Sequence, residues 1–148
     1  MKREVEKIGA KGVRMDGLPM SLDELKKLTP IEFQNWILGA MDGTVSKKPV
    51  HDMGIDGLTF MERVPVQVKQ QEHVGRPRVD DFETAVRRYY SDALKASVER
   101  GEESFVMRGI IVAFSFSSGA YEEVARVKSE GIEIELLKVE DVVSHLSG

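Results

Sequence analysis

Helical periodicity first appears near residue 20. Ser21-Leu-Asp-Glu24 and Thr29-Pro-Ile-Glu32 both have the S/T-x-x-E form of a capping box, so each predicts the start of a helix. In the second segment, apolar side chains recur at intervals of three and four residues from Phe33 to Met41, and Asp42-Gly43 follows them. This spacing predicts a core helix of about 13 residues that ends at the Asp-Gly pair.

Extended segments replace the helical pattern between residues 44 and 70. The stretch Val-Pro-Val-Gln-Val-Lys of residues 64–69 alternates in character, so a strand would carry its valines on one face and Gln67 and Lys69 on the other. Leu58–Met61 predicts a preceding strand, and the two residues after it are enough for the turn of an antiparallel hairpin. The hairpin would bring Asp56 near Gln67 and Lys69.

Helices and strands alternate in the second half of the chain. A long helical pattern follows Gly75-Arg-Pro77, with a break expected near Tyr90 and an end near Gly101. The apolar run Arg108–Phe116 is typical of a strand buried on both faces, as in a parallel sheet. The remaining predicted elements are a helix at Ala120–Ser129, a strand at Ile132–Leu137 and a helix at Val139–Leu146. This order predicts an α/β fold with right-handed crossovers and helices against a central sheet.

Composition narrows the class of protein. A chain of 148 residues with 41% hydrophobic and 31% charged residues is expected to fold as one globular unit. No apolar stretch approaches the length of a membrane span, and the N-terminus lacks the apolar segment of a secretion signal, so a cytoplasmic protein is expected. The absence of cysteine excludes disulfides, thiol nucleophiles and zinc sites of the cysteine type.

The formal net charge of −4 is unevenly distributed. Residues 91–148 hold six basic and eleven acidic side chains, so a generally basic coat for nucleic acid is excluded. A local basic face in the middle of the chain remains open. Its candidate members are Lys47, Lys48, Arg63, Lys69, Arg76, Arg78, Arg87 and Arg88.

The strongest candidate for chemistry is Asp56 followed, after ten residues, by Gln67-Val-Lys69. A carboxylate on one strand and an ammonium on its neighbour would hold a divalent metal and a phosphate together, which is the chemistry of phosphodiester hydrolysis. The spacing also fits a structural interpretation, in which Asp56 is a turn residue and Gln67 and Lys69 form the solvated side of a strand. Spacing alone leaves both interpretations open.

Four ordered blocks extend this pattern into a resemblance. They are Asp52-Met-Gly-Ile-Asp-Gly57, Val66-Gln-Val-Lys69, Val74-Gly-Arg-Pro77 and the stretch from Ile111 through Glu123. Over roughly residues 28–146 the chain resembles the Mrr-like restriction endonuclease domains of the PD-(D/E)XK nuclease superfamily. The resemblance implies a restriction-endonuclease-like α/β/α sandwich with a central mixed sheet. It also implies a DNA endonuclease of restriction-modification type that depends on Mg²⁺ or Mn²⁺.

The resemblance assigns roles to individual residues. Asp56 is similar to the metal-binding aspartate and Lys69 to the catalytic lysine, while Gln67 stands where most of the superfamily has a carboxylate. Gln67 would then complete the metal coordination through its carboxamide oxygen, a weaker ligand than a carboxylate. Mrr-like domains also tend to carry a Phe-Glu pair on the first helix, where this chain has Phe33-Gln34. Glu32 is the nearest acidic side chain, although its expected role is the capping box.

The partners implied by the resemblance are DNA and a second copy of the chain, because cutting both strands requires two sites. Lys48, Arg76 and Arg78 are the candidate phosphate contacts. Residues 1–28 form an N-terminal extension that resembles the linker to an adenine-type DNA methyltransferase, which suggests such a domain or subunit as a further partner. The nuclease domain would then comprise residues 29–148.

Three alternatives to an endonuclease stay open. The glutamines at positions 34 and 67 also suit a non-catalytic DNA-binding or specificity module attached to a DNA methyltransferase. A structure-selective nuclease of the Holliday-junction type would share the fold. A purely structural or protein-interaction domain is the third alternative.

Overall fold

The structure is a computed structural model that describes residues 20–45 and 54–147. Its centre is a five-stranded sheet in the order β2-β3-β4-β5-β6. The first three strands are antiparallel, whereas β4, β5 and β6 are parallel, so the sheet is mixed as expected. The strands are β2 (Gly43–Val45), β3 (Gly57–Thr59), β4 (Pro65–Val68), β5 (Met107–Ala113) and β6 (Ile132–Lys138).

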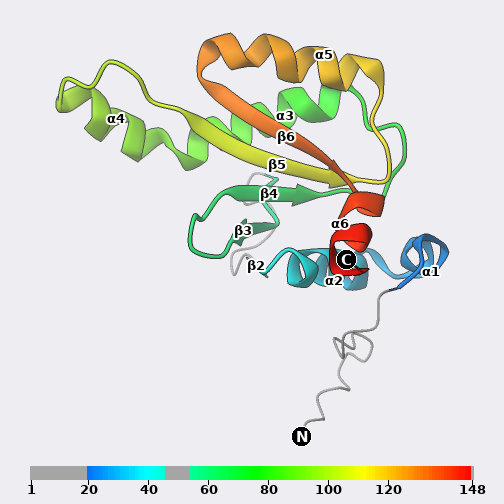
Figure 1. The fold of residues 1–148 in the computed structure, drawn as a ribbon. Coiled ribbons are helices and arrows are strands. Elements are labelled where there is room, and N and C mark those ends of the chain that lie inside the picture. The colour runs from blue at the N-terminus through cyan, green and yellow to red at the C-terminus, as the bar shows by residue number, and fades with distance from the viewer. Residues whose placement is uncertain (1–19, 46–53, 148) are drawn as a thin grey trace, which may run out of the picture.

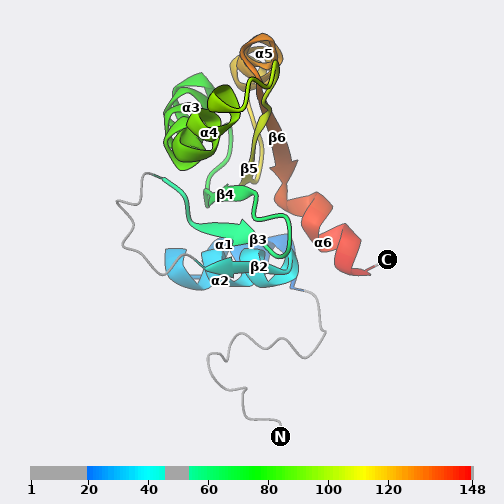
Figure 2. The same cartoon turned by 90° about the vertical axis from the view of Figure 1, so that its left-hand side faces the viewer.

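Helices lie on both faces of this sheet (Figure 1) (Figure 2). They are α1 (Leu22–Lys27), α2 (Pro30–Ala40), α3 (Arg76–Tyr89), α4 (Ser91–Glu99), α5 (Ser118–Val127), the 3₁₀ helix η2 (Lys128–Glu130) and α6 (Val139–Ser147). One core cluster joins α3 and α5 to the sheet around Phe82 and Ile111, and the other joins α1, α2 and α6 to it around Phe33 and Val112. The described helices include none that is long and apolar enough to cross a membrane.

The predicted helix signals are confirmed. Both capping boxes form. The carboxylates of Glu24 and Glu32 accept from the backbone N–H groups of Ser21 and Thr29, whose side chains accept from the glutamate N–H groups in turn. The second helix is slightly shorter than expected, with 11 residues, and Asp42 follows it at a φ of 58°. Tyr90 ends α3 and begins α4, which is the break predicted there.

The β3–β4 hairpin is confirmed, but the prediction that its first strand reaches Met61 is wrong. The strand ends at Thr59, whose carbonyl and hydroxyl oxygens accept the backbone N–H groups of Arg63 and Val64 across 3.0 and 2.9 Å. Met61 and Arg63 adopt positive φ angles of 71° and 58°, which a strand cannot contain. The turn therefore begins two residues early and exposes the side chain of Phe60.

The two faces of β4 meet different helices, as the alternation of its residues predicts. Val66 and Val68 pack in the cluster with α2, whereas Gln67 lies on the face covered by α3. The crossover from β4 to β5 contains α3, so this helix passes over the residues predicted to carry the chemistry. Because β4 and β5 are parallel, the chain must cross over between them, and α3 in this crossover lies opposite β4 at the candidate site.

Candidate functional site

Asp56 is held against β4 by two hydrogen bonds. Its backbone N–H donates to the carbonyl of Val66 across 2.8 Å, and its side-chain Oδ2 accepts from the backbone N–H of Val68 across 2.7 Å. The two bonds fall on either side of Gln67 in the strand. The proximity of Asp56 to this part of β4, predicted from the hairpin, is therefore confirmed.

Partial burial disfavours the charged form of the Asp56 side chain. Desolvation raises the pKa of Asp56, and the Val68 N–H and the nearby Lys69 ammonium offset this rise only in part. A carboxylate with an incomplete set of compensating charges is stabilised further by any cation placed beside it. Asp56 is thus suited to bind one.

Gln67 is buried, with only 6% of its surface exposed, so the interpretation of this residue as the solvated side of a strand is wrong. Its Nε2 donates to the carbonyl of Gly54 across 2.9 Å, and because that partner is only an acceptor, it determines which end of the amide is which. The other end, Oε1, is buried without a hydrogen-bond partner among the described residues. An unsatisfied buried acceptor costs about 1–3 kcal/mol, so this oxygen requires a ligand or water.

Gly54 allows this approach. It has a φ of +79°, and a Cβ there would lie 2.8 Å from Nε2 of Gln67. Residues other than glycine rarely adopt this backbone conformation. The glycine therefore lets the backbone carbonyl reach the Gln67 amide.

Lys69 lies half-buried at the end of β4, on the same face as Gln67. Its backbone N–H donates to the carbonyl of Val112 across 2.8 Å, which continues the parallel ladder with β5. Gln67 and Lys69 both line a pocket of about 340 Å³ between β4 and α3. The lining residues are Gly54, Gln67, Lys69, Arg78, Asp81, Thr84, Ala85 and Arg88.

The structure separates the residues predicted to contact DNA. Arg78 lines the pocket, with Nη1 3.9 Å from Oδ2 of Asp81. Arg76 instead faces the carboxylates of Asp80 and Glu123, at 3.6 and 3.5 Å. Lys48 lies outside the described residues.

The wider basic face is also divided. Arg87 pairs with Glu130 across 2.6 Å, and Arg63 lies in the β3–β4 turn, where its carbonyl accepts from the hydroxyl of Tyr89. Lys47 is outside the described residues. Of the candidates in the described part of the chain, Lys69, Arg78 and Arg88 converge on the pocket.

The position after Phe33, where an acidic side chain was considered, lies on α2 and holds Gln34. This helix packs on the sheet face opposite α3. Glu32 is accounted for by its hydrogen bond to the Thr29 N–H at 3.0 Å. The helical carboxylate that does line the pocket is Asp81 of α3. The sequence analysis missed Asp81, although its spacing of three residues from Arg78 and seven from Arg88 signals a shared helix face.

A second group of carboxylates lies between α3 and α5. Asp80, Glu83 and Glu123 each place an oxygen within 4.8 Å of the others. Arg126 donates to both oxygens of Glu123, at 2.8 and 2.6 Å, and thereby lowers the pKa of Glu123 to about 2. Burial and the adjacent Glu123 raise the pKa of Glu83 to about 8. These surroundings favour the protonated form of Glu83 and the charged form of Glu123, a pair that the sequence analysis did not single out.

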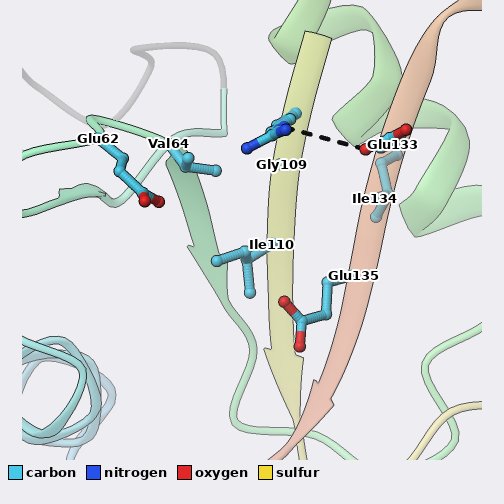
Figure 3. A pocket seen from close by; sticks show the side chains of 8 residues that line it. Glu62, Val64, Gly109, Ile110, Glu133, Ile134 and Glu135 are labelled. Atoms are coloured by element: carbon cyan, nitrogen blue, oxygen red, sulfur yellow. Dashed lines mark ion pairs between the residues drawn. The ribbon is translucent and has the colours of Figure 1, made fainter. Parts of the chain in front are cut away.

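Two other hollows of the described surface have a lining with a net negative charge. One of about 290 Å³ lies over β5 and β6 and is lined by Glu62, Glu133 and Glu135 together with Arg108; Figure 3 shows the three glutamates. Arg108 is 3.9 Å from Glu133 in that hollow. Another, between α2 and α6, is lined by Asp42 and Asp141. Acidic side chains thus outnumber basic ones in both hollows, whereas the reverse holds in the α3 pocket.

No protein-family model matches the chain, and comparison with curated proteins and with solved structures finds no match either.

Proposed function

We propose that this chain is a metal-dependent DNA endonuclease domain of restriction-modification type. In this proposal Asp56 and Gln67 hold a Mg²⁺ or Mn²⁺ ion, and Lys69 acts beside them. The observation that carries the proposal is the buried Oε1 of Gln67, which has no hydrogen-bond partner among the described residues and lies on β4 between the two hydrogen bonds of Asp56. The mixed α/β arrangement supports the restriction-endonuclease-like fold that the resemblance implies.

The donor set fits a hard divalent cation. Mg²⁺ commonly takes one or two protein oxygens and completes its octahedron with water and substrate phosphate. The carboxylate of Asp56 and the unpartnered carboxamide oxygen of Gln67 are such oxygens. When bound, the cation would supply Lewis-acid chemistry, polarising a phosphoryl oxygen and activating water for attack.

The remaining side chains act on the substrate. The Lys69 ammonium, on the same face as Gln67, would stabilise the negative charge that develops on phosphoryl oxygens as water attacks phosphorus and one ester P–O bond breaks. Asp56 is fixed by the Val68 N–H, so its carboxylate needs little reorganisation to bind a cation. A homodimer would place two such sites on the two strands of DNA.

Supercoiled-plasmid nicking tests this proposal. Wild type is incubated with Mg²⁺ or Mn²⁺ on methylated and unmethylated plasmid, beside Asp56→Asn, Lys69→Ala and the control Lys95→Ala, which removes an exposed lysine of α4. Nicking by wild type and Lys95→Ala, lost in the other two variants, is the expected result. Binding of duplex without cleavage in either metal would instead favour the non-catalytic DNA-binding module.

A second substrate separates the remaining alternatives. Faster cleavage of a four-way junction than of linear duplex would identify a structure-selective nuclease. Failure to bind any DNA at low salt, where phosphate contacts are strongest, would overturn the proposal in favour of a structural or interaction domain.

A further inference from the structure

The pocket between β4 and α3 is cationic in an acidic protein. Its lining includes three cationic side chains and one carboxylate, a net charge of +2. The chain as a whole has a net charge of −4, and the hollows over β5–β6 and between α2 and α6 are each lined by a net charge of −2. A polyanion approaching the described surface is therefore drawn to the α3 pocket.

Two consecutive arginines of α3 have opposite environments. Both side chains are exposed, but Arg87 is bound to Glu130 across 2.6 Å. Arg88 lines the pocket, and no carboxylate of the described residues lies within 4 Å of its guanidinium. The guanidinium N–H groups of Arg88 are therefore available to a ligand, whereas the Arg87 guanidinium is engaged in its ion pair with Glu130.

Arg88 and Arg78 lie on the face of α3 that lines the pocket, ten residues apart. At a rise of about 1.5 Å per residue, their Cα atoms are about 15 Å apart along the helix. A nucleic-acid strand rises about 3.4 Å per nucleotide, so this distance corresponds to about four nucleotides. Arg78 is partly neutralised by Asp81 at 3.9 Å, which leaves Arg88 as the stronger anion-binding group of the two.

We propose that Arg88 is a positioning residue that binds a backbone phosphate of duplex DNA at the α3 pocket and thereby sets the register of the strand against Asp56 and Lys69. This inference rests on the proposed function, because it assigns Arg88 to the substrate of that same site. The bidentate guanidinium suits a phosphate, and the contact carries no base information. Binding through Arg88 is thus independent of DNA sequence.

Fluorescence anisotropy with a labelled 20-base-pair duplex tests the inference. The assay is run in EDTA, so that cleavage does not occur, over a series of salt concentrations. We compare wild type with Arg88→Ala, the conservative Arg88→Lys and the neighbouring control Arg87→Ala. Loss of one phosphate contact is expected to weaken binding about tenfold and to reduce the slope of log K against log salt by about one in Arg88→Ala. Arg87→Ala should retain the wild-type slope, and Arg88→Lys should restore most of it.

The outcomes separate the two proposals. If wild type binds no duplex at low salt, the proposed function fails and takes the assignment of Arg88 with it. If wild type binds but Arg88→Ala and Arg87→Ala share its affinity and slope, Arg88 is not a phosphate contact although the nuclease proposal stands. Equal losses in both variants would show that general surface charge, not the pocket, determines binding, and would overturn the inference.

Discussion

Asp56 accepts the backbone N–H of Val68 through Oδ2 across 2.7 Å, so one side chain both continues the pairing of two strands and offers a carboxylate to the candidate site. The two roles make opposing demands. The hydrogen bond needs an acceptor oxygen, whereas burial disfavours the charge and raises the pKa of Asp56. Substitutions that separate acceptor from charge will distinguish the contributions to folding and to function.

Asp56→Ala and Asp56→Asn should therefore differ in stability. Alanine leaves the Val68 N–H without its partner and should lower the free energy of unfolding by about 1–3 kcal/mol. Asparagine retains an acceptor and removes a half-buried charge, so at pH 7 its free energy of unfolding should match or exceed that of wild type. Urea denaturation at pH 7 measures both. Equal losses in the two variants would mean that the charge itself stabilises the fold.

Gln67→Glu should make stability depend on a divalent metal. A carboxylate at this position faces the Gly54 carbonyl without a donor, so the variant should unfold at a lower temperature than wild type in EDTA. Mn²⁺ should recover most of the loss if Oε1 lies in a metal site. Gln70→Glu is the matched control, because Gln70 also donates its amide, to the carbonyls of Leu25 and Leu28, but away from the pocket. Recovery of both variants by Mn²⁺, or of neither, would count against the site.

The Glu83 pKa of about 8 predicts a loss of stability as pH rises. The folded state keeps a proton on Glu83 that the unfolded chain releases near pH 4.5, so the free energy of unfolding should fall between about pH 5 and pH 8. At about 1.4 kcal/mol per pKa unit, the difference between 4.5 and about 8 corresponds to a decline on the order of 5 kcal/mol. Glu83→Gln should flatten this decline, whereas Glu122→Gln, at an exposed position of α5, should leave it unchanged. Urea denaturation at pH 5, 7 and 9 provides the comparison.

Gly109 lies where β5 approaches α3 closely. A Cβ at this position would lie 2.5 Å from Cε2 of Phe82 and 2.9 Å from Cγ2 of Val86. Gly109→Ala should cost about 1–3 kcal/mol, because both neighbours are buried and have little room to move. Gly119→Ala, whose Cβ would meet only ordinary contacts in α5, should be neutral or stabilising. Thermal unfolding measures both variants. Equal unfolding temperatures would mean that the contact between β5 and α3 can adjust to the added methyl group.

Much of the fold was predictable because its signals are local. Capping boxes at Ser21 and Thr29 and the alternation of residues 64–69 depend only on neighbours in the sequence, and the structure bears them out. The end of β3 was placed two residues too late because the positive φ angles of Met61 and Arg63 have no signature in their side chains. Turn geometry there is set by the hydrogen bonds of Thr59, not by hydrophobic pattern.

Local pattern in the sequence is enough to predict the alternation of strands and helices and the proximity of Asp56 to β4, since a short hairpin leaves the chain few alternatives. Which charged side chains meet depends instead on how the helices pack. Arg87 pairs with Glu130, 43 positions away in the sequence, while its neighbour Arg88 lines the pocket. The two side chains differ because the packing of α3 between β4 and α5 places successive residues in different surroundings. The burial of Gln67 and the unpartnered state of its Oε1 follow from the same packing, which no local pattern encodes.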